Sequence, residues 1–119
     1  MPAPPDDHLP LTPVVLHILL AVAAGERHGY AIAQEVEELT GGDVRMGPGT
    51  LYGSIQRMLA SGLIEEAAPR AARGDEDRAR RYYRATTLGR RVLDRELERL
   101  ARVVEHARAR RLLPRPRAT

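Results

Sequence analysis

The chain of 119 residues contains no cysteine, tryptophan, phenylalanine or lysine. Without cysteine there is no disulfide framework, no thiolate nucleophile and no cysteine-ligated zinc or iron–sulfur site, and we expect a cytoplasmic protein. The longest apolar run, residues 14–24, is interrupted by His17 and falls short of the roughly 18 residues that a membrane helix needs. The first ten residues lack the features of a signal peptide, so we expect neither export nor a membrane partner.

A catalytic or metal-binding group is also missing from the sequence. No Ser/His/Asp grouping or general acid/base pair is recognisable, and the histidines lack the paired spacing of zinc ligands: His8, His17, His28 and His106. Gly47, Gly49 and Gly53 form a glycine run, but a dinucleotide fingerprint needs a buried strand before it and a P-loop needs a lysine. We therefore predict a protein that is not an enzyme and holds no cofactor or metal.

Charge is divided along the chain. Residues 1–44 hold one Arg against seven Asp or Glu, a net charge of −6, whereas residues 45–119 hold 18 Arg against nine, a net charge of +9. Arginine offers a planar fork that matches phosphate and guanine edges, although the codon usage of a GC-rich genome also explains the missing lysine. The segregation of charge, more than the use of arginine in place of lysine, indicates that residues 45–119 bind a polyanionic partner.

Apolar spacing and helix-start residues predict three helices in the first sixty residues. Thr12 and Pro13 begin a helix that is apolar nearly all round and should be buried on most sides. An amphipathic helix over 29–40 is ended by a glycine pair, and a third helix opens at Pro48 and ends at 61–62. Their apolar stripes are Ile32, Val36 and Leu39 in the second helix, and Leu51, Ile55, Met58 and Leu59 in the third.

The second half of the chain predicts a hairpin and one long helix. Two short strands, 63–67 and 81–85, flank a segment rich in proline, glycine and charge. Thr86 or Thr87 then caps a helix to about Leu113. Leu88 and Val92 can fold back on their own domain, but the later apolar positions reach beyond a domain of this size. We predict homodimerisation through a heptad seam of Leu93, Leu97, Leu100, Val104 and Ala107.

This order of elements is that of a winged helix. We predict a mainly α (α+β) fold, a winged helix-turn-helix with a two-stranded β-wing and a long C-terminal dimerisation helix. The expected organisation is a disordered leader over 1–10, the DNA-binding domain over 11–86, the dimerisation helix over 87–113 and a disordered tail over 114–119.

In a winged helix the third helix enters the major groove and the wing lies over the DNA backbone, so double-stranded DNA is the expected partner. Gln56 and Arg57 have the reach for base edges, and Arg57 is the strongest candidate. Tyr30 and Tyr52 suit phosphate contacts, but packing between the helices is about as good an interpretation. The expected DNA-binding residues are Tyr30, Gly49, Thr50, Tyr52, Gly53, Ser54, Gln56, Arg57, Arg80 and Arg81.

Three segments, 11–42, 47–66 and 80–93, resemble the PadR family of bacterial transcriptional regulators. The resemblance covers roughly residues 11–105, and its motifs are His28-Gly29-Tyr30, Pro48-Gly49-Thr50-Leu51-Tyr52 and Arg81-Tyr82-Tyr83-Arg84. It implies a homodimer of the smaller family branch that represses transcription from a palindromic operator. It also implies that a small-molecule effector, of unknown identity, can bind. This chain has no Trp or Phe for a stacking pocket, so the open alternatives are an apolar cleft lined by Leu and Val or a repressor without a ligand.

Two points stay open at the level of sequence. One alternative function is a protein-interaction module, in which the winged helix is a scaffold and the heptad seam recruits a different protein. The other point is Gly53, where relatives often carry a larger side chain and glycine costs about 1 kcal/mol of helix propensity. Either its absent side chain lets the helix backbone approach the groove more closely, or this protein reads less sequence there.

Overall fold

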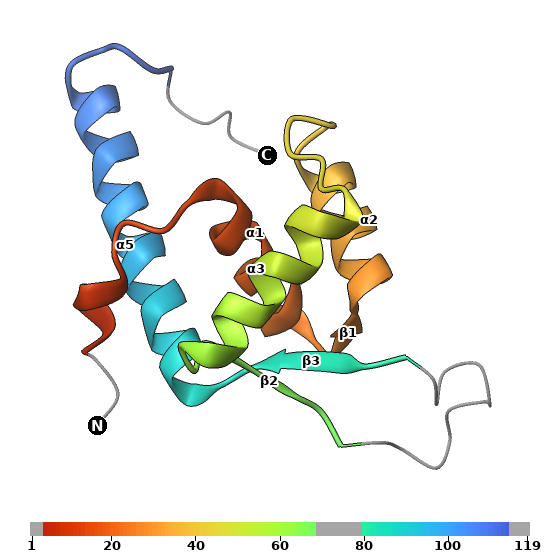
Figure 1. The fold of residues 1–119 in the computed structure, drawn as a ribbon. Coiled ribbons are helices and arrows are strands. Elements are labelled where there is room, and N and C mark those ends of the chain that lie inside the picture. Colours follow the sequence, from red (N-terminus) through yellow and green to blue (C-terminus); the bar gives the residue numbers. More distant parts are fainter. Residues whose placement is uncertain (1–3, 69–79, 115–119) are drawn as a thin grey trace.

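The computed structural model describes residues 4–68 and 80–114. A small antiparallel sheet lies along one edge of a group of helices, and this α+β arrangement confirms the expected winged-helix class (Figure 1). In chain order the elements are η1 (Pro5–His8, a 3-10 turn), α1 (Pro13–Ala24), β1 (Arg27–His28), α2 (Gly29–Leu39), α3 (Pro48–Ala60), β2 (Ile64–Glu66), β3 (Tyr82–Ala85) and α5 (Thr87–Ala109).

Helix α1 lies at the centre of the domain. The side chain of Thr12 accepts a hydrogen bond from the Val15 N–H at 3.3 Å, so the predicted cap is confirmed. Ile18, Leu19 and Val22 are at most 2% exposed, and α1 contacts α2, α3, β3 and α5. A helix that is packed on this many sides needs apolar residues nearly all round, as the sequence indicated.

Helices α2 and α3 form the helix-turn-helix. Gly41 and Gly42 adopt positive φ values of 61° and 87°, which favour glycine and end α2. The predicted stripe of α3 is confirmed, because Leu51, Ile55 and Met58 are all buried. The expected stripe of α2 is wrong at its end: Leu39, the last helical residue, is 67% exposed because the chain there has passed the edge of the core.

The sheet has three strands, one more than expected. Their order is β1-β3-β2, all antiparallel, with Arg27 opposite Tyr83 and Glu65 opposite Arg84. The sequence did not predict β1, because a strand of two residues is too short to show a period. Strand β1 matters for function since it leads directly into α2 and so ties the start of that helix to the wing.

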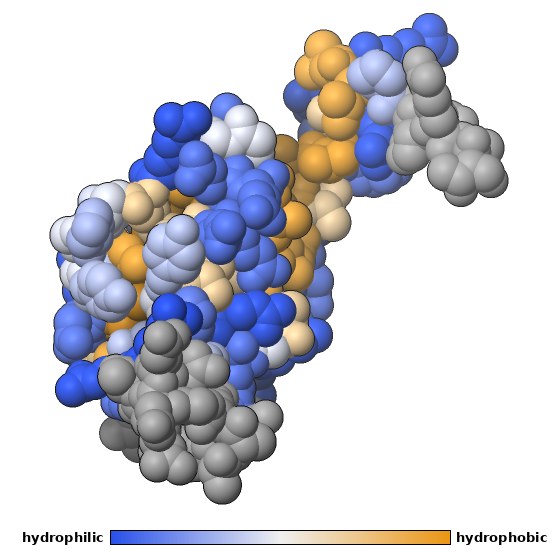
Figure 2. All heavy atoms as spheres, turned by 90° about the vertical axis from the view of Figure 1, so that its right-hand side faces the viewer, coloured by the Kyte–Doolittle hydropathy of each residue, from blue (hydrophilic) through white to orange (hydrophobic). Residues whose placement is uncertain are grey.

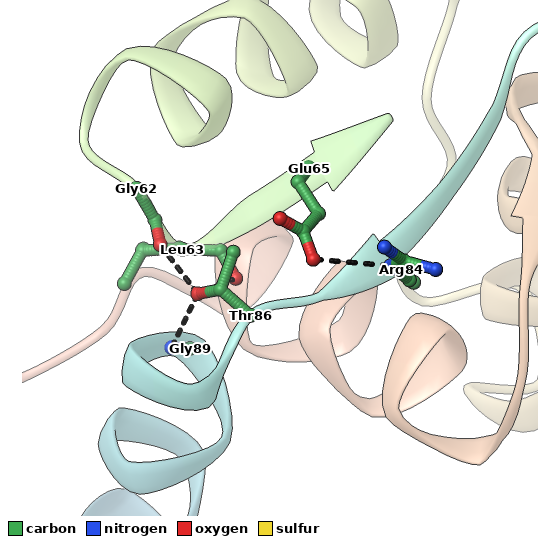
Figure 3. Close-up of polar contacts among 6 residues, drawn as sticks. All are labelled: Gly62, Leu63, Glu65, Arg84, Thr86 and Gly89. Carbon is green, nitrogen blue, oxygen red and sulfur yellow. Dashed lines mark hydrogen bonds and ion pairs between the residues drawn. The ribbon is translucent and has the colours of Figure 1, made fainter. Parts of the chain in front are cut away.

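The junction between the wing and α5 is closely packed (Figure 3). Thr86 caps α5: its hydroxyl accepts from the Gly89 N–H at 2.9 Å and donates to the Gly62 carbonyl. The Thr86 N–H donates to the Leu63 carbonyl at 3.1 Å. A Cβ added to Gly89 would lie 1.9 Å from that same carbonyl oxygen, far inside van der Waals contact. Only glycine fits at this point of the helix.

The expected disordered leader over 1–10 is wrong for the residues that the structure describes. Residues 1–3 lie outside the described residues, but residues 4–10 are not a disordered extension, because η1 packs on α5 and Leu9 packs against the core. The Leu11 N–H donates to the Glu96 carboxylate at 2.7 Å, and Asp6 forms an ion pair with Arg95. The sequence gives no local signal for this packing, because these partners lie some 85 residues away along the chain.

Glu96 is 1% exposed, which is unusual for a carboxylate. It accepts hydrogen bonds from the Arg99 guanidinium and from the Leu11 N–H. The bond from Arg99 lowers the pKa of this carboxyl below its ordinary value; burial opposes that shift, and the Leu11 N–H adds to it. Glu96 is therefore a buried, satisfied anion that holds the N-terminal segment on α5.

Helix α5 leaves the domain beyond Glu96. It ends at Ala109 rather than near Leu113 as expected, and Arg111, just beyond it, has a positive φ of 59°. The predicted seam is wrong at Leu93, because this residue is 3% exposed and belongs to the core of its own domain. Of the seam residues that follow, Leu97 and Val104 are 39% and 36% exposed, and Leu100 and Ala107 are half-buried. Figure 2 shows hydrophobic atoms gathered on this projecting part.

Within residues 4–68 and 80–114, no helix has both the length and the apolar character that crossing a bilayer requires. The expected disordered tail falls on 114–119, of which only Pro114 is described, and most of the predicted wing tip also lies outside the described residues.

We predict that Gly89→Ala lowers the free energy of unfolding by at least about 1–3 kcal/mol, because the added methyl group meets the Leu63 carbonyl. Chemical denaturation monitored by circular dichroism measures this. The control is Gly53→Ala, where a Cβ meets only the Arg57 side chain at 3.4 Å and the gain in helix propensity is up to about 1 kcal/mol. Equal stability of the two variants would contradict the packing at the junction.

We predict that Glu96→Ala costs about 1–3 kcal/mol at neutral pH, because the Leu11 N–H loses its acceptor. Since the pKa of Glu96 is lowered in the folded state, its stabilising contribution is present above the unfolded pKa of about 4.3 and is lost as pH falls through the folded value. The stability difference from the unmutated protein should thus shrink below about pH 4. Glu98→Ala, at an exposed position nearby, serves as control. A stability difference between Glu96→Ala and the unmutated protein that does not change with pH would contradict the assignment of Glu96 as a buried anion.

Candidate nucleic-acid interface

One face of α3 is open to solvent. Its buried stripe packs on the domain, and the opposite side exposes Gly49, Thr50, Gln56 and Arg57, with Gly53 partly covered. Among residues 4–68 and 80–114, Arg57 forms no ion pair, and its guanidinium donates to Ser54 at 3.2 Å. This face therefore presents one cation, one amide and one hydroxyl on a single helix, groups that suit phosphate and base edges.

Ser54 is not on this face. Its side chain is 2% exposed and lies within the buried stripe of α3, so the expectation that it contacts DNA is wrong. Positions 51, 54 and 58 follow the spacing of three and four residues that places them on one side of a helix. The hydroxyl accepts from Arg57 instead and links the buried side to the exposed side.

Tyr30 lies at the start of α2 and is 68% exposed. Its ring stacks on His28 with centroids 6.5 Å apart, and His28 meets Tyr82 of β3 edge-on at 5.4 Å. His28 also caps α2, because its Nδ1 accepts from the Ala31 N–H at 3.2 Å. Tyr30 and His28 thus lie together at the first turn of α2, where backbone N–H groups favour an anion.

Tyr52 takes the packing role, one of the two that the sequence left open. Its ring packs against the start of α2, since a Cβ on Gly29 would lie 2.9 Å from the Tyr52 hydroxyl oxygen and 3.2 Å from the ring carbon that bears it. The side chain is nevertheless 49% exposed. Gly29 therefore makes room for Tyr52 between the two helices, and Tyr52 keeps about half of its surface open to solvent.

A cavity of about 310 Å³ joins these residues to the base of the wing. Both predicted wing residues, Arg80 and Arg81, line it, and Arg80 lies 3.1 Å from Nε2 of His28. Tyr83 also lines it, and burial raises the pKa of its hydroxyl, which stays a protonated donor at neutral pH. Sequence reasoning missed the roles of His28 and Tyr83, because the strand pairing that gathers them here involves the unpredicted β1.

Two of the three glutamates in the second half of α2 are paired. Glu35 and Glu37 bind Arg27 and Arg45, each at 3.2 Å, whereas Glu38 is exposed. On the wing, Glu66 lies 3.9 Å from Arg81, a longer and exposed ion pair. Exposed pairs of this kind contribute little to stability, so a phosphate can compete for the arginine.

Metal binding finds no support in the part of the chain that the structure describes. Over residues 4–68 and 80–114, no three or more His, Asp or Glu side chains are grouped as metal ligands would be. The segment between the two wing strands also carries Arg70, Arg73 and Arg78, which lie outside the described residues.

Comparisons with known proteins point to one class. A sequence profile described as the transcriptional regulator PadR-like family matches residues 15–95. The transcriptional regulator Rv3488 of Mycobacterium tuberculosis is 44% identical over 94 residues, which make up 76% of this chain and 81% of that protein. An uncharacterized 37.1 kDa protein in transposon TN4556 of Streptomyces fradiae is 36% identical over 86 residues, which are 72% of this chain but 22% of that protein's length.

The fold has solved counterparts. A PadR family transcription regulator from Clostridium difficile R20291 superposes with a TM-score of 0.68 at 20% sequence identity, covering 82% of this chain and 97% of that one. A transcriptional regulator from Clostridium thermocellum superposes with a TM-score of 0.63 at 23% identity, covering 81% and 87%. At such identities the likeness establishes the shared fold.

Proposed function

Because the chain belongs to the PadR-like family of transcriptional regulators, we propose that it binds a palindromic DNA operator as a homodimer and represses transcription there. Helix α3 enters the major groove, and the wing lies along the backbone. A cytoplasmic location follows from this role, and neither catalysis nor a cofactor belongs to the proposal.

The main support for this proposal is the exposed face of α3, which lies beside the cavity of about 310 Å³ that Tyr30 and Arg80 line. Gln56 and Arg57 project from a helix whose other side is fully packed, so they are available for base edges. Tyr30 and Arg80 come from α2 and the wing, line one cavity beside α3, and suit backbone phosphates next to the groove. Base-reading and phosphate-binding groups are thus combined in one surface.

Dimerisation supplies the second half-site. The projecting part of α5 exposes Leu97, Val103 and Val104 on a helix that is otherwise strongly charged. Such a strip is stabilised by burial against a second helix, and a twofold pair of recognition helices matches a palindromic site. No Tyr, Trp or Phe side chain lies on the projecting part of α5, so a stacking pocket for an effector is not included in the proposal.

We predict that the affinity of the protein for its operator falls steeply with salt, by a log–log slope of about −0.9 for each phosphate neutralised. Arg57→Ala should cost about 1–3 kcal/mol and relax the preference at one base position. Arg80→Ala serves as the matched comparison: it should weaken all sequences alike and reduce the salt slope by about 1. Fluorescence anisotropy on sequences selected from a random pool measures both. If Arg57→Ala weakens every sequence equally, Arg57 contacts phosphate instead.

We predict a dimer in sedimentation equilibrium and a shift toward monomer in Val104→Glu, because the new charge falls on the apolar strip of α5. Ala109→Glu is the control, since it adds the same charge to an exposed position on the other side of the same helix. A monomer in the unmutated protein would refute the homodimer. It would then favour the alternative in which the strip recruits a different protein.

A further inference from the structure

The side chain of Arg57 lies folded along α3 over Gly53. A Cβ placed on Gly53 would meet one group within 4 Å, the Arg57 Nη1 at 3.4 Å. The other terminal nitrogen, Nη2, donates to the Ser54 hydroxyl at 3.2 Å. Side chains on a helix lean toward its N-terminus, so a residue four positions on naturally covers the surface above Gly53. The guanidinium is held over a position that has no side chain of its own.

Ser54 makes this arrangement more than a transient contact. At 2% exposure its hydroxyl is fixed in the packed side of α3, and it offers the guanidinium an acceptor that does not move. An exposed arginine otherwise samples many rotamers, and restraining one in advance reduces the entropy lost on binding. Gly53 provides the space and Ser54 provides the anchor.

We propose that Gly53 is a specificity-determining residue that acts through Arg57. The missing side chain leaves a path along which Arg57 lies toward the N-terminal part of α3, the part that contacts base edges in helix-turn-helix proteins. Gly53 is then neither a site of closer backbone approach nor a lost reading position, because the guanidinium occupies the space above it. This inference rests on the proposed DNA-binding function.

The size of the side chain at position 53 determines whether the Arg57 guanidinium keeps its position along α3. An alanine methyl group at 3.4 Å from Nη1 is an ordinary contact and leaves Arg57 in place. The two γ-methyl groups of valine extend into the space that the guanidinium occupies and displace it. At Gly49, one turn earlier, a Cβ meets nothing within 4 Å, so Gly49→Val is a matched control for the same change on the same helix.

The first test uses the free protein, through ¹⁵N relaxation of the Arg57 Nε–H group. We expect an ordered group in the unmutated protein, in Gly53→Ala and in Gly49→Val. Gly53→Val and Ser54→Ala should both raise its mobility, the first by displacement and the second by loss of the acceptor. An Arg57 side chain that is equally mobile in all five proteins overturns the inference whatever the protein binds.

The second test is a double-mutant cycle on DNA selected from a random pool. Gly53→Val and Arg57→Ala should each lower affinity for the preferred sequence about 5- to 150-fold and relax the same base position. In the Arg57→Ala background, Gly53→Val should have little further effect. Additive losses at two different base positions overturn the inference but leave the proposed function intact. Failure of the unmutated protein to select any sequence contradicts the proposed function itself.

Discussion

The close approach of α5 to the wing at Gly89 and Leu63 is the constraint on which the arrangement of the protein depends. The Leu63 carbonyl receives the Thr86 N–H and occupies the space where a Cβ of residue 89 would lie. Thr86 also holds the carbonyl of Gly62, only two residues beyond the end of α3. The first turn of α5 is therefore fixed against the end of the proposed recognition helix. In a dimer joined through α5, this short connection sets the separation of the two α3 helices and thereby the spacing of the DNA half-sites.

Glu96 provides a second fixed point on the same helix. It lies seven residues beyond Gly89, about 10 Å along the axis, at the place where α5 leaves the domain. Burying a carboxylate is costly unless its oxygens are satisfied, and here Arg99 and the Leu11 N–H satisfy them. Two anchors of different chemistry, one steric and one electrostatic, thus align the inner half of α5. The outer half extends about 20 Å further as a straight continuation.

The elements that could be predicted from the sequence are those with local signals. Caps such as Thr12, the glycine pair after α2 and the stripe of α3 depend on residues a few positions apart. The predictions were wrong where tertiary contacts determined the structure, or where the type of residue gave a misleading signal. Leu93 and Leu97 share one heptad pattern, and only the position where the domain ends separates them. Ser54 sits at a buried helical position, but its polar side chain suggested the exposed face. Strand β1 exists only because β3 pairs with it.

Charge along the sequence also proved an incomplete guide to the binding surface. Eight of the 18 arginines in the basic part lie between residues 90 and 111, on or just after α5, away from the open face of α3. Others are neutralised locally, as Arg45 is by Glu37 and Arg84 by Glu65. Among the residues that the structure describes, the positive charge at the proposed interface comes from Arg57, Arg80 and Arg81. Specificity then depends on how each of these cations is held, and this is why the space above Gly53 and the anchor at Ser54 matter beside net charge.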